Sequence, residues 1–458
     1  MVLGNYPAAL QKLVGPAGTL RNRIVRGGGI TLIGFGAGQA LRLASNLIMT
    51  RLLTADAFGL MAITISLQVL MVMMSDVGIN ASIIRSPSAT RVSFLSTAWV
   101  SQIVRGIIIA LILFFFAIFL ILTRTSGIFN ADTVFADPRL PVFLFVIAGT
   151  SLLDGLRSVK MVLYQRELKM GRIVSLELGA QVCAIVAMLM SYSLGAGAYA
   201  LVIGAAAAVT VTLFGSHLFF SGPTIGFDIN RADFAEIFNF GKWLLVASIA
   251  GFITQRGDQF IFGAIMDKGT FGLYSIATIW ITLVIVLFDI VQNRITFPAF
   301  SEVWRDRKED MTRLYYRFRL VADVACFSIF LCILFFADFL FDIIYPDEYA
   351  GVVSFIKYLA LVVLLLPYRI LTSILLADGK GRSFMTITLI PATLMLLAPL
   401  IYRLTSVPQT IVYVASLQLA TIPISWYLVR QHIKLNFLYE GWLILVAFGF
   451  IILFLNGQ

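Results

Sequence analysis

The chain has 458 residues, of which 60% are apolar and only 13% are charged, and its mean hydropathy is +0.94. This composition excludes a soluble domain of this length, which would expose far more charge, and it indicates a polytopic membrane protein. The net charge of +10 is explained below by membrane topology, so it does not indicate a nucleic-acid partner.

A helix needs about 20 residues to cross the roughly 30 Å hydrocarbon core of a bilayer. The chain holds twelve apolar runs long enough to do so, and a thirteenth of bare spanning length. They lie at residues 27–50, 57–82, 93–123, 140–160, 173–194, 197–220, 238–265, 270–297, 320–345, 352–376, 384–402, 408–429 and 441–456. The sequence therefore predicts an all-α polytopic membrane protein.

The two halves of the chain resemble each other. A shift of 213 residues gives seven identities over the 23 positions of residues 58–80. The identical positions are Phe58, Gly59, Leu60, Ile63, Leu70, Asp76 and Asn80, which fall on Phe271, Gly272, Leu273, Ile276, Leu283, Asp289 and Asn293. The polar matches inside apolar runs are not explained by composition. Internal duplication is a recurrent plan of transporters that move one half against the other.

The duplication predicts the organisation of the chain. A basic cytoplasmic N-terminal segment, 1–26, precedes an N-lobe of six helices, 27–222, and a C-lobe of six helices, 223–432. An extra C-terminal transmembrane helix, 433–458, follows. Because six helices return the chain to the side where it started, we expect the lobes to be related by a pseudo-two-fold axis along the membrane normal.

Basic residues predict the orientation. The N-terminus and the loops after every second helix carry 24 of the 34 Lys and Arg residues, whereas the opposite loops carry six. Because cytoplasmic loops are enriched in Lys and Arg, the N-terminus is predicted to be cytoplasmic. The longest loop on that side, 298–319, is predicted to be an amphipathic surface helix. Prolines predict broken helices in the second half, at Pro367, Pro391, Pro399 and Pro423.

Four arginines lie within the apolar runs: Arg42, Arg105, Arg256 and Arg369. An arginine at the bilayer centre costs at least about 2.5–3.5 kcal/mol on insertion scales, so each needs a partner, a cavity or a nearby interface. Arg369 is predicted near mid-depth, just past the kink at Pro367. It is expected to line a cavity, and the alternative is a structural ion pair.

Arg256 lies in the polar tetrad Gln255-Arg256-Gly257-Asp258, for which the alternative is a local compensation of Arg256 by Asp258. Arg42 shares a helix face with Gln39 and Asn46, although it could instead snorkel to the outer surface. In the 213-residue register Arg42 falls on Gln255, one position before Arg256. The two halves would then carry similar cations on equivalent helices.

Arg105 lies in an over-long run, where a position at the cytoplasmic interface is the alternative. Asp76 and Asp289 are repeat-equivalent acids, each four residues before an asparagine. They are candidates for a proton or cation site, or for partners that hold the arginines. The alternative is hydrogen bonding between helices.

Signatures of an enzyme are missing from the sequence. The two histidines have no metal-ligand spacing, the three cysteines imply neither a disulfide nor a metal, and no P-loop occurs. We therefore expect neither catalytic residues, nor a metal, nor a bound cofactor.

Three segments resemble a known family. The stretch Thr50–Pro87 carries an R-x-L-T-x-x-x-F-G-L motif and then Asp76, Gly78 and Arg85. Residues 256–263 and 377–382 are similar to the family's second-half entry and to its loop after helix 10. The family is the polysaccharide transporter family, the Wzx-type lipid-linked oligosaccharide flippase branch of the multidrug/oligosaccharidyl-lipid/polysaccharide exporter superfamily.

The resemblance implies a flippase of a bacterial inner membrane that moves a polyprenyl-pyrophosphate-linked oligosaccharide from the cytoplasmic to the outer leaflet by alternating access, for cell-surface polysaccharide biosynthesis. A polysaccharide polymerase and other assembly proteins would then be partners, and H⁺ or Na⁺ a coupling ion. Arginine binds phosphates bidentately. We therefore expect pyrophosphate or cavity contacts from Arg42, Arg256 and Arg369, together with Asn46, Gln255 and Arg105.

The acids Asp76, Asp258 and Asp289 are then expected to be ion-pair or coupling partners of the arginines, while Trp280, Tyr274, Gln102 and Gln418 are candidates for contacts to sugars. Two alternatives remain. A drug/cation antiporter of the same superfamily would have cavity carboxylates that dominate over arginines. A membrane polysaccharide polymerase would need a large outer loop with catalytic residues, and the longest outer loop here, 124–139, is short and contains no histidine.

Overall fold

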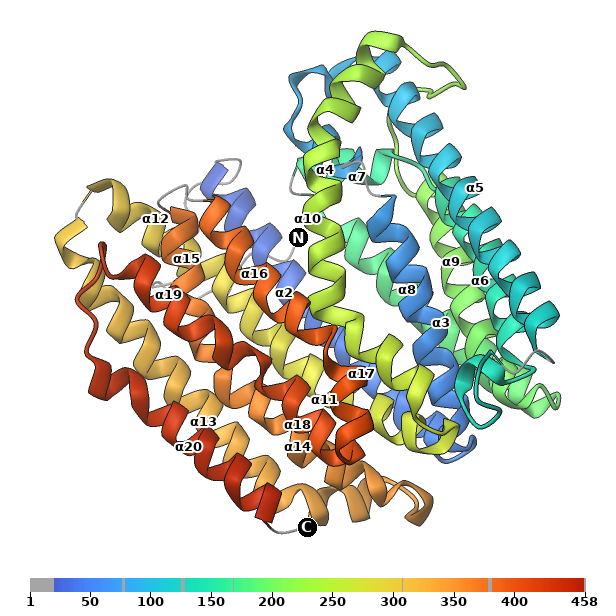
Figure 1. Ribbon diagram of the computed structural model, residues 1–458. Coiled ribbons are helices and arrows are strands. Elements are labelled where there is room, and N and C mark those ends of the chain that lie inside the picture. Colours follow the sequence, from blue (N-terminus) through green and yellow to red (C-terminus); the bar gives the residue numbers. More distant parts are fainter. Residues whose placement is uncertain are drawn as a thin grey trace, which may run out of the picture. The chain divides into compact units, whose positions relative to one another are not determined.

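The computed structural model describes residues 20–75, 79–124, 128–167, 169–306, 308–377 and 381–456. In these ranges all regular secondary structure is helical (Figure 1). Nine of the described helical stretches are long and apolar enough to cross a membrane, and a tenth is formed if the bent pair α6 and α7 counts as one span. The chain is therefore an all-α, multi-pass membrane protein, as the composition predicts.

The helices of the first half follow the predicted runs closely. They are α2 (Leu20–Thr50), α3 (Ala55–Met74), α4 (Ile79–Arg85), α5 (Val92–Thr123), α6 (Leu140–Gly155), α7 (Lys160–Arg166), α8 (Met170–Ser193) and α9 (Ala200–Leu218). The predicted run 57–82 is not one helix, because α3 ends at Met74 and α4 is separate. α5 packs along α6, and α8 packs along both α9 and α2.

Two glycines explain the close packing of α5 on α6. A Cβ atom on Gly106 would lie 2.9 Å from the Cα of Gly155, and one on Gly155 would lie 3.1 Å from the Cα of Gly106. Small residues allow helix backbones to approach closely in membranes, where lipid and side chains are equally apolar. At Gly155 the helix ends, and the chain bends by 65° into α7.

The second half begins with α10 (Arg231–Ile265), α11 (Lys268–Val291) and the π-helical turn η4 (Gln292–Thr296). The remaining elements are α12 (Phe297–Asp306), α13 (Met311–Ile344), α14 (Gly351–Leu365), η7 (Leu366–Arg369), α15 (Ile370–Ala377), α16 (Gly381–Met395), α17 (Ala398–Leu404), α18 (Val407–Ser416), η8 (Leu417–Thr421), α19 (Ile422–Val429) and α20 (Phe437–Asn456). α14 is the central helix of this half, with contacts to α11, α13, α18 and α20.

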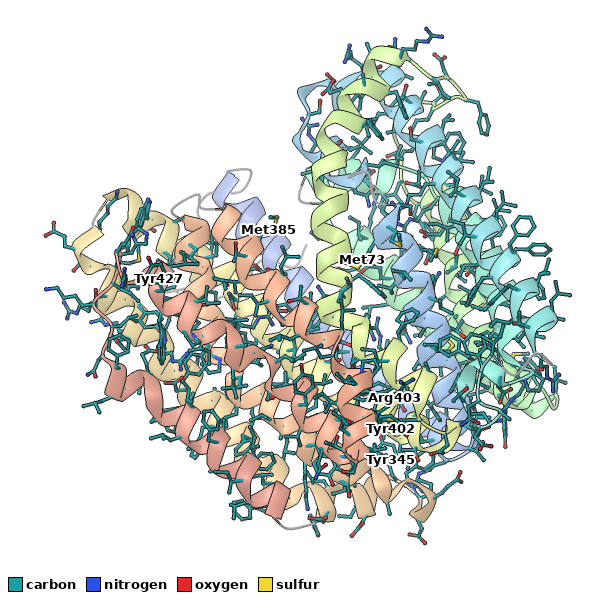
Figure 2. The ribbon with its side chains drawn as sticks, in the orientation of Figure 1. Met73, Tyr345, Met385, Tyr402, Arg403 and Tyr427 are labelled. Carbon is teal, nitrogen blue, oxygen red and sulfur yellow. The ribbon has the colours of Figure 1, made fainter. Side chains whose placement is uncertain are left out.

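Proline accounts for the broken helices of the second half, because it has no N–H to donate. Pro367 lies in the 3₁₀ turn η7 between α14 and α15, and Pro399 and Pro423 stand in the first turns of α17 and α19. These three breaks are confirmed, whereas Pro391 lies inside the continuous helix α16. The loops alternate between the two ends of the helices, so that Tyr427 and Tyr345 lie at opposite ends of this half (Figure 2).

The predicted surface helix 298–319 is wrong in part. α12 ends at Asp306 and α13 begins at Met311, so the segment belongs to two helices. Phe300 and Met311 do not face lipid, because both are fully buried in a core cluster with Tyr315 and residues of α15. Hydrophobic burial against the protein therefore replaces the predicted burial in the membrane surface.

The contacts divide the chain into two compact units. The first consists of residues 1–53, 67–126 and 138–248, and the second of residues 54–66, 127–137 and 249–458. The helices α3 and α10 contribute to both units. α20, the predicted extra helix, belongs to the second unit and packs on α14. The predicted segment 1–26 lies outside the described residues up to residue 19 and continues into α2.

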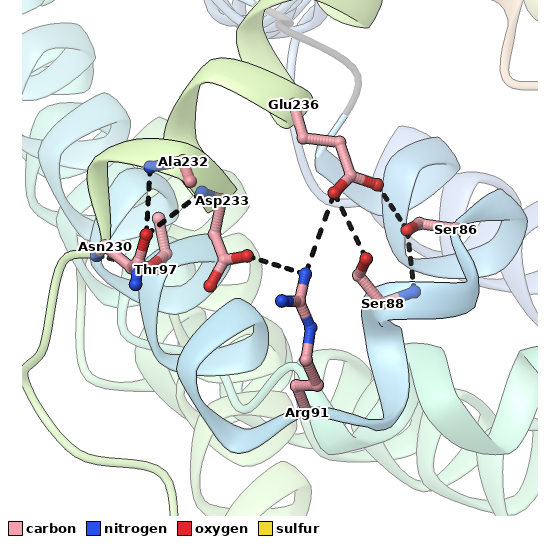
Figure 3. A network of polar contacts seen from close by, with 8 residues as sticks. All are labelled: Ser86, Ser88, Arg91, Thr97, Asn230, Ala232, Asp233 and Glu236. Atoms are coloured by element: carbon pink, nitrogen blue, oxygen red, sulfur yellow. Dashed lines mark hydrogen bonds and ion pairs between the residues drawn. The ribbon is translucent and has the colours of Figure 1, made fainter.

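In the first unit, a network of polar contacts ties the start of α10 to the turn before α5 (Figure 3). Arg91 Nη2 lies 2.9 Å from Asp233 Oδ1 and 3.9 Å from Glu236 Oε2. The hydroxyls of Ser86 and Ser88 donate to the carboxylate of Glu236. Asp233 is buried and the other two charged groups are exposed, so the Arg91–Asp233 pair is the most protected contact of this network.

Candidate functional site

Two candidate residues of the second unit form an ion pair. Arg369 Nη1 lies 3.0 Å from Asp289 Oδ1, and their side chains are 38% and 35% exposed. Arg369 ends η7, the turn that Pro367 imposes, and Asp289 lies in the last turn of α11. The guanidinium therefore has a compensating charge and still retains exposed surface for a ligand.

Gln292, which the sequence analysis did not single out, fixes the backbone beneath Arg369. Its side-chain amide donates to the Arg369 carbonyl over 2.8 Å and to Ser373 Oγ over 3.0 Å. Gln292 begins the π-helical turn η4, and such turns are frequent at functional sites. The signal available in the sequence was a second polar residue, three positions after Asp289, in an apolar run.

The polar tetrad lies on α10 as predicted, but its members are not joined in the predicted way. Asp258 accepts a hydrogen bond of 2.6 Å from the hydroxyl of Tyr274. No ion pair joins Asp258 to Arg256, both of which are among the described residues. Arg256 is partly buried and Gln255 is exposed. The Arg256 side chain is thus not neutralised by its neighbour at ion-pair distance.

The candidates of α2 lie one turn apart in the first unit. Arg42 is exposed, whereas the side-chain oxygen of Asn46 is buried and has no hydrogen-bond partner within the described ranges. Nearby, Ser45 packs on α8, with its hydroxyl 3.6 Å from Met188 Sδ. Asp76, the remaining acidic candidate, lies outside the described residues.

Arg105 lines a polar cavity inside the first unit. The cavity has a volume of about 60 Å³ and lies between α3, α4, α5 and α6. Its polar lining includes Asn80, Gln102, Arg105, Ser151, Asp154 and Arg157. Arg157 Nη1 lies 3.3 Å from Asp154 Oδ1, so the lining carries two guanidinium groups and one carboxylate.

Three candidates for sugar contacts make hydrogen bonds to other parts of the protein. The side-chain amide of Gln102 donates to three backbone carbonyls, of Asp154, Gly155 and Arg157, at 3.3, 3.1 and 2.9 Å. The indole N–H of Trp280 donates to Tyr345 Oη at 2.9 Å, and Tyr274 donates to Asp258. Their polar groups therefore hold helices together. Gln418 lies in η8 and is partly buried.

A buried charge cluster in the second unit was not predicted from the sequence. Arg319 was expected at the end of the loop 298–319, whereas it lies in α13, is fully buried and contacts Asp323 at 2.9 Å. Glu440 of α20 is also fully buried, with its Oε2 4.0 Å from Arg319 Nη2. The spacing of Arg319 and Asp323 by four residues was the only signal, and on most helices it marks a solvated face.

Comparison with known proteins gives a family and a fold. The family described as "Polysaccharide biosynthesis protein" matches residues 48–354, more than half of the chain. Lipopolysaccharide biosynthesis protein WzxC of Escherichia coli (strain K12) is 21% identical over 330 residues, which make up 71% of this chain and 64% of WzxC. The chain thus spans slightly less than two thirds of the length of this relative.

Two solved structures share the fold. Lipid II flippase MurJ, in an inward closed conformation, superposes with a TM-score of 0.66 and 11% identity, covering 92% of this chain and 97% of MurJ. An inward-facing multidrug resistance MATE family transporter of the MOP superfamily gives a TM-score of 0.64 and 13% identity, covering 86% of this chain and 94% of that one. At such identities the likeness establishes the fold alone, and it confirms the predicted all-α fold of many membrane-spanning helices.

Proposed function

This chain belongs to the polysaccharide biosynthesis family, a family of membrane transporters, and we propose that it moves a polyprenyl-pyrophosphate-linked oligosaccharide from the cytoplasmic to the outer leaflet. The observation that carries this proposal is the position of Arg369. Its guanidinium lies at a break between two helices, is partly exposed, and is held in place by Asp289 and Gln292.

The chemistry of the cargo suits such a group. A pyrophosphate carries at least two negative charges, and a guanidinium binds phosphate oxygens bidentately with a fixed fork of donors. Arg256 on α10 is a second cation of the same unit, without an ion-pair partner among the described residues. Gln255, beside Arg256 on α10, is a further candidate of the second unit for contacts to the headgroup or its sugars. Arg42, Asn46 and Arg105 are the candidates of the first unit.

The translocation step follows from differential binding. A ligand shifts a conformational equilibrium only by binding one state more tightly than the other. The pyrophosphate would be captured by the arginines from the inner leaflet, and its charge would replace part of the Asp289–Arg369 attraction. Release on the outer side would restore that pair. The coupling ion, H⁺ or Na⁺, would reset the cycle, and the inner membrane with a cytoplasmic N-terminus is the corresponding location.

The proposal is tested with proteoliposomes that contain a fluorescent polyprenyl-pyrophosphate-linked oligosaccharide. Flipping is measured as the fraction of saccharide that a membrane-impermeant glycosidase releases over time. We expect the purified protein to accelerate this release, and Arg256→Ala and Arg369→Ala to slow it at least tenfold. The matched control is Arg403→Ala, at an exposed arginine at the end of α17, which should flip normally.

Two results would contradict the proposal. Equal flipping by wild type and the Arg256→Ala/Arg369→Ala double variant would remove the arginines from the mechanism. Absence of flipping, together with ion-driven extrusion of an organic cation that Asp289→Asn abolishes, would identify a drug/cation antiporter instead.

A further inference from the structure

The buried cluster around Glu440 has no part in the proposed headgroup site. Arg319 and Asp323 lie one turn apart on α13, and Glu440 lies in the first turn of α20, 117 residues after Asp323 along the chain. At most 1% of each of the three charged side chains is exposed. Two carboxyl groups and one guanidinium are therefore enclosed by protein near the same ends of α13 and α20.

The guanidinium is not shared equally by the two carboxyl groups. Arg319 Nε lies 2.9 Å from Asp323 Oδ1, the distance of a direct ion pair. The nearest Glu440 oxygen, Oε2, lies 4.0 Å from Arg319 Nη2, which is beyond hydrogen-bond range. One face of the guanidinium is covered by the ring of Tyr368, whose centroid lies 3.8 Å from Arg319 Cζ. Asp323 is thus the charged partner of Arg319.

Glu440 is held by neutral groups. The hydroxyl of Tyr315 donates to Glu440 Oε1 over 2.8 Å, and the hydroxyl of Tyr368 donates to the Glu440 backbone carbonyl. Oε2, the oxygen that faces Arg319, has no well-formed hydrogen bond with a described residue. This carboxyl oxygen therefore lies in the protein interior without a well-formed hydrogen bond. The same holds for both oxygens of Asp323, but Asp323 Oδ1 lies 2.9 Å from Arg319 Nε.

The part of the chain that the structure describes supplies no second cation to this cluster. The titratable and polar groups that face the two carboxyl groups are Arg319, Tyr315, Tyr316, Cys326, Tyr368, Tyr439, Trp426 and Trp442. Of these, only Arg319 carries a positive charge. On the adjacent helix α14, Lys357 is paired with Asp338 at 2.6 Å. With both carboxyl groups ionised, the cluster would hold a net negative charge in an apolar interior, which is strongly unfavourable.

We propose that the Arg319–Asp323–Glu440 cluster is a proton-binding site, with the proton on Oε2 of Glu440. The carboxylate takes the proton from water, and the bound state then consists of a neutral Glu440 beside an Arg319–Asp323 ion pair. Glu440 reaches the cluster only because α20 packs on α14 within the second unit. Proton release and loosening of the first turn of α20 are therefore linked, since the ionised carboxylate gains most from contact with water.

The experiment measures protonation directly, by infrared spectroscopy of the full chain in lipid nanodiscs at neutral pH. A protonated carboxyl group gives a C=O stretching band that ionised carboxylates lack. We expect this band in the wild type and its loss in Glu440→Gln. The matched control, Asp338→Asn, removes an exposed acid of the same helix α13 and should leave the band unchanged.

Three further readouts make the result decisive. Because glutamine is neutral and has the size of a protonated glutamate, Glu440→Gln should unfold at the wild-type temperature. In Asp323→Asn the guanidinium has only Glu440 as a partner, so Glu440 should ionise and the band should disappear. Replacing Na⁺ by choline should leave the wild-type band as it is.

The proposal is overturned if the wild type has no protonated carboxyl band, or if Glu440→Gln retains it. It is also overturned if Glu440→Gln melts several degrees lower, as loss of an ion pair would cause, or if the band emerges only after Na⁺ is removed, as for a bound metal ion. None of these readouts depends on transport, so failure here leaves the proposed flippase function untouched.

Discussion

Gly59 and Gly272, which occupy equivalent positions in the two sequence repeats, pack directly against each other. A Cβ atom on Gly59 would lie 3.2 Å from the backbone nitrogen of Gly272, and one on Gly272 would lie 1.9 Å from the carbonyl oxygen of Ala55. The start of α3 and the start of α11 therefore meet through their backbones. The duplicated F-G-L sequence is explained here by contact between the two copies.

This contact predicts a sharp effect of one methyl group. Gly272→Ala should lower the stability of the protein by about 1–3 kcal/mol, because the new Cβ meets backbone that cannot rotate away. Thermal unfolding in detergent measures this effect. Gly149→Ala, on α6, is the control, since a Cβ there has no neighbour within 4 Å. Equal melting temperatures for the two variants would show that α3 and α11 do not meet in this way.

The Asp289–Arg369 pair is predicted to matter for transport more than for stability. Both side chains are about one-third exposed, and such pairs contribute at most about 1 kcal/mol. The exchanged variant Asp289→Arg/Arg369→Asp should therefore fold and melt close to the wild type. It should nevertheless flip the lipid-linked oligosaccharide at least tenfold more slowly, because the cation has left its place at the helix break. Normal flipping by the exchanged variant would make the pair purely structural.

Gln102 is predicted to stabilise the bend between α6 and α7. Gln102→Leu removes the donors to two carbonyls at the end of α6 and to the Arg157 carbonyl that follows. It should cost about 1–3 kcal/mol, the usual effect of leaving buried polar groups unpaired. Ser101→Ala is the matched control, because Ser101 bonds only within its own helix, to the Thr97 carbonyl. If both variants unfold at the same temperature, the amide does not hold the bend.

The network at the start of α10 is predicted to limit local opening. Asp233→Ala should speed hydrogen exchange of the amides of residues 231–238, because it removes the buried acid that pairs with Arg91. The expected loss of local stability is about 1 kcal/mol, since Arg91 itself is exposed. Arg231→Ala, at an exposed arginine of the same turn, is the control. Unchanged exchange in Asp233→Ala would show that the network does not hold the helix.

Much of the fold follows from the sequence because transmembrane helices are specified locally. Apolar runs of spanning length predict where helices form, and the missing N–H of Pro367 predicts the break before Arg369. The start of α4 was missed because Asp76 and Asn80 were interpreted as candidate site residues within one long helix. Ser75 and Gly78, which lie between the end of α3 and the start of α4 in the sequence, were the available signal of a break.

The polar interior was harder to predict because it depends on packing between distant segments. Tyr274 and Gln102 were expected to face a ligand. Instead, the side chain of each donates a hydrogen bond to a residue of another helix. The burial of Arg319 depends on Glu440, 121 residues further along the chain, and on the ring of Tyr368. The Asp289–Arg369 contact could have been predicted from the sequence, since both residues had been selected as charged residues in apolar runs.

The central claim is that arginines of this chain hold the pyrophosphate of a lipid-linked saccharide. The most direct measurement is native mass spectrometry of gently purified protein, comparing wild type with Arg256→Ala/Arg369→Ala. The account predicts a polyprenyl-pyrophosphate species that remains bound to the wild type and disappears from the double variant. Bulk phospholipid alone, retained equally by both proteins, would contradict it and leave these two arginines as structural cations.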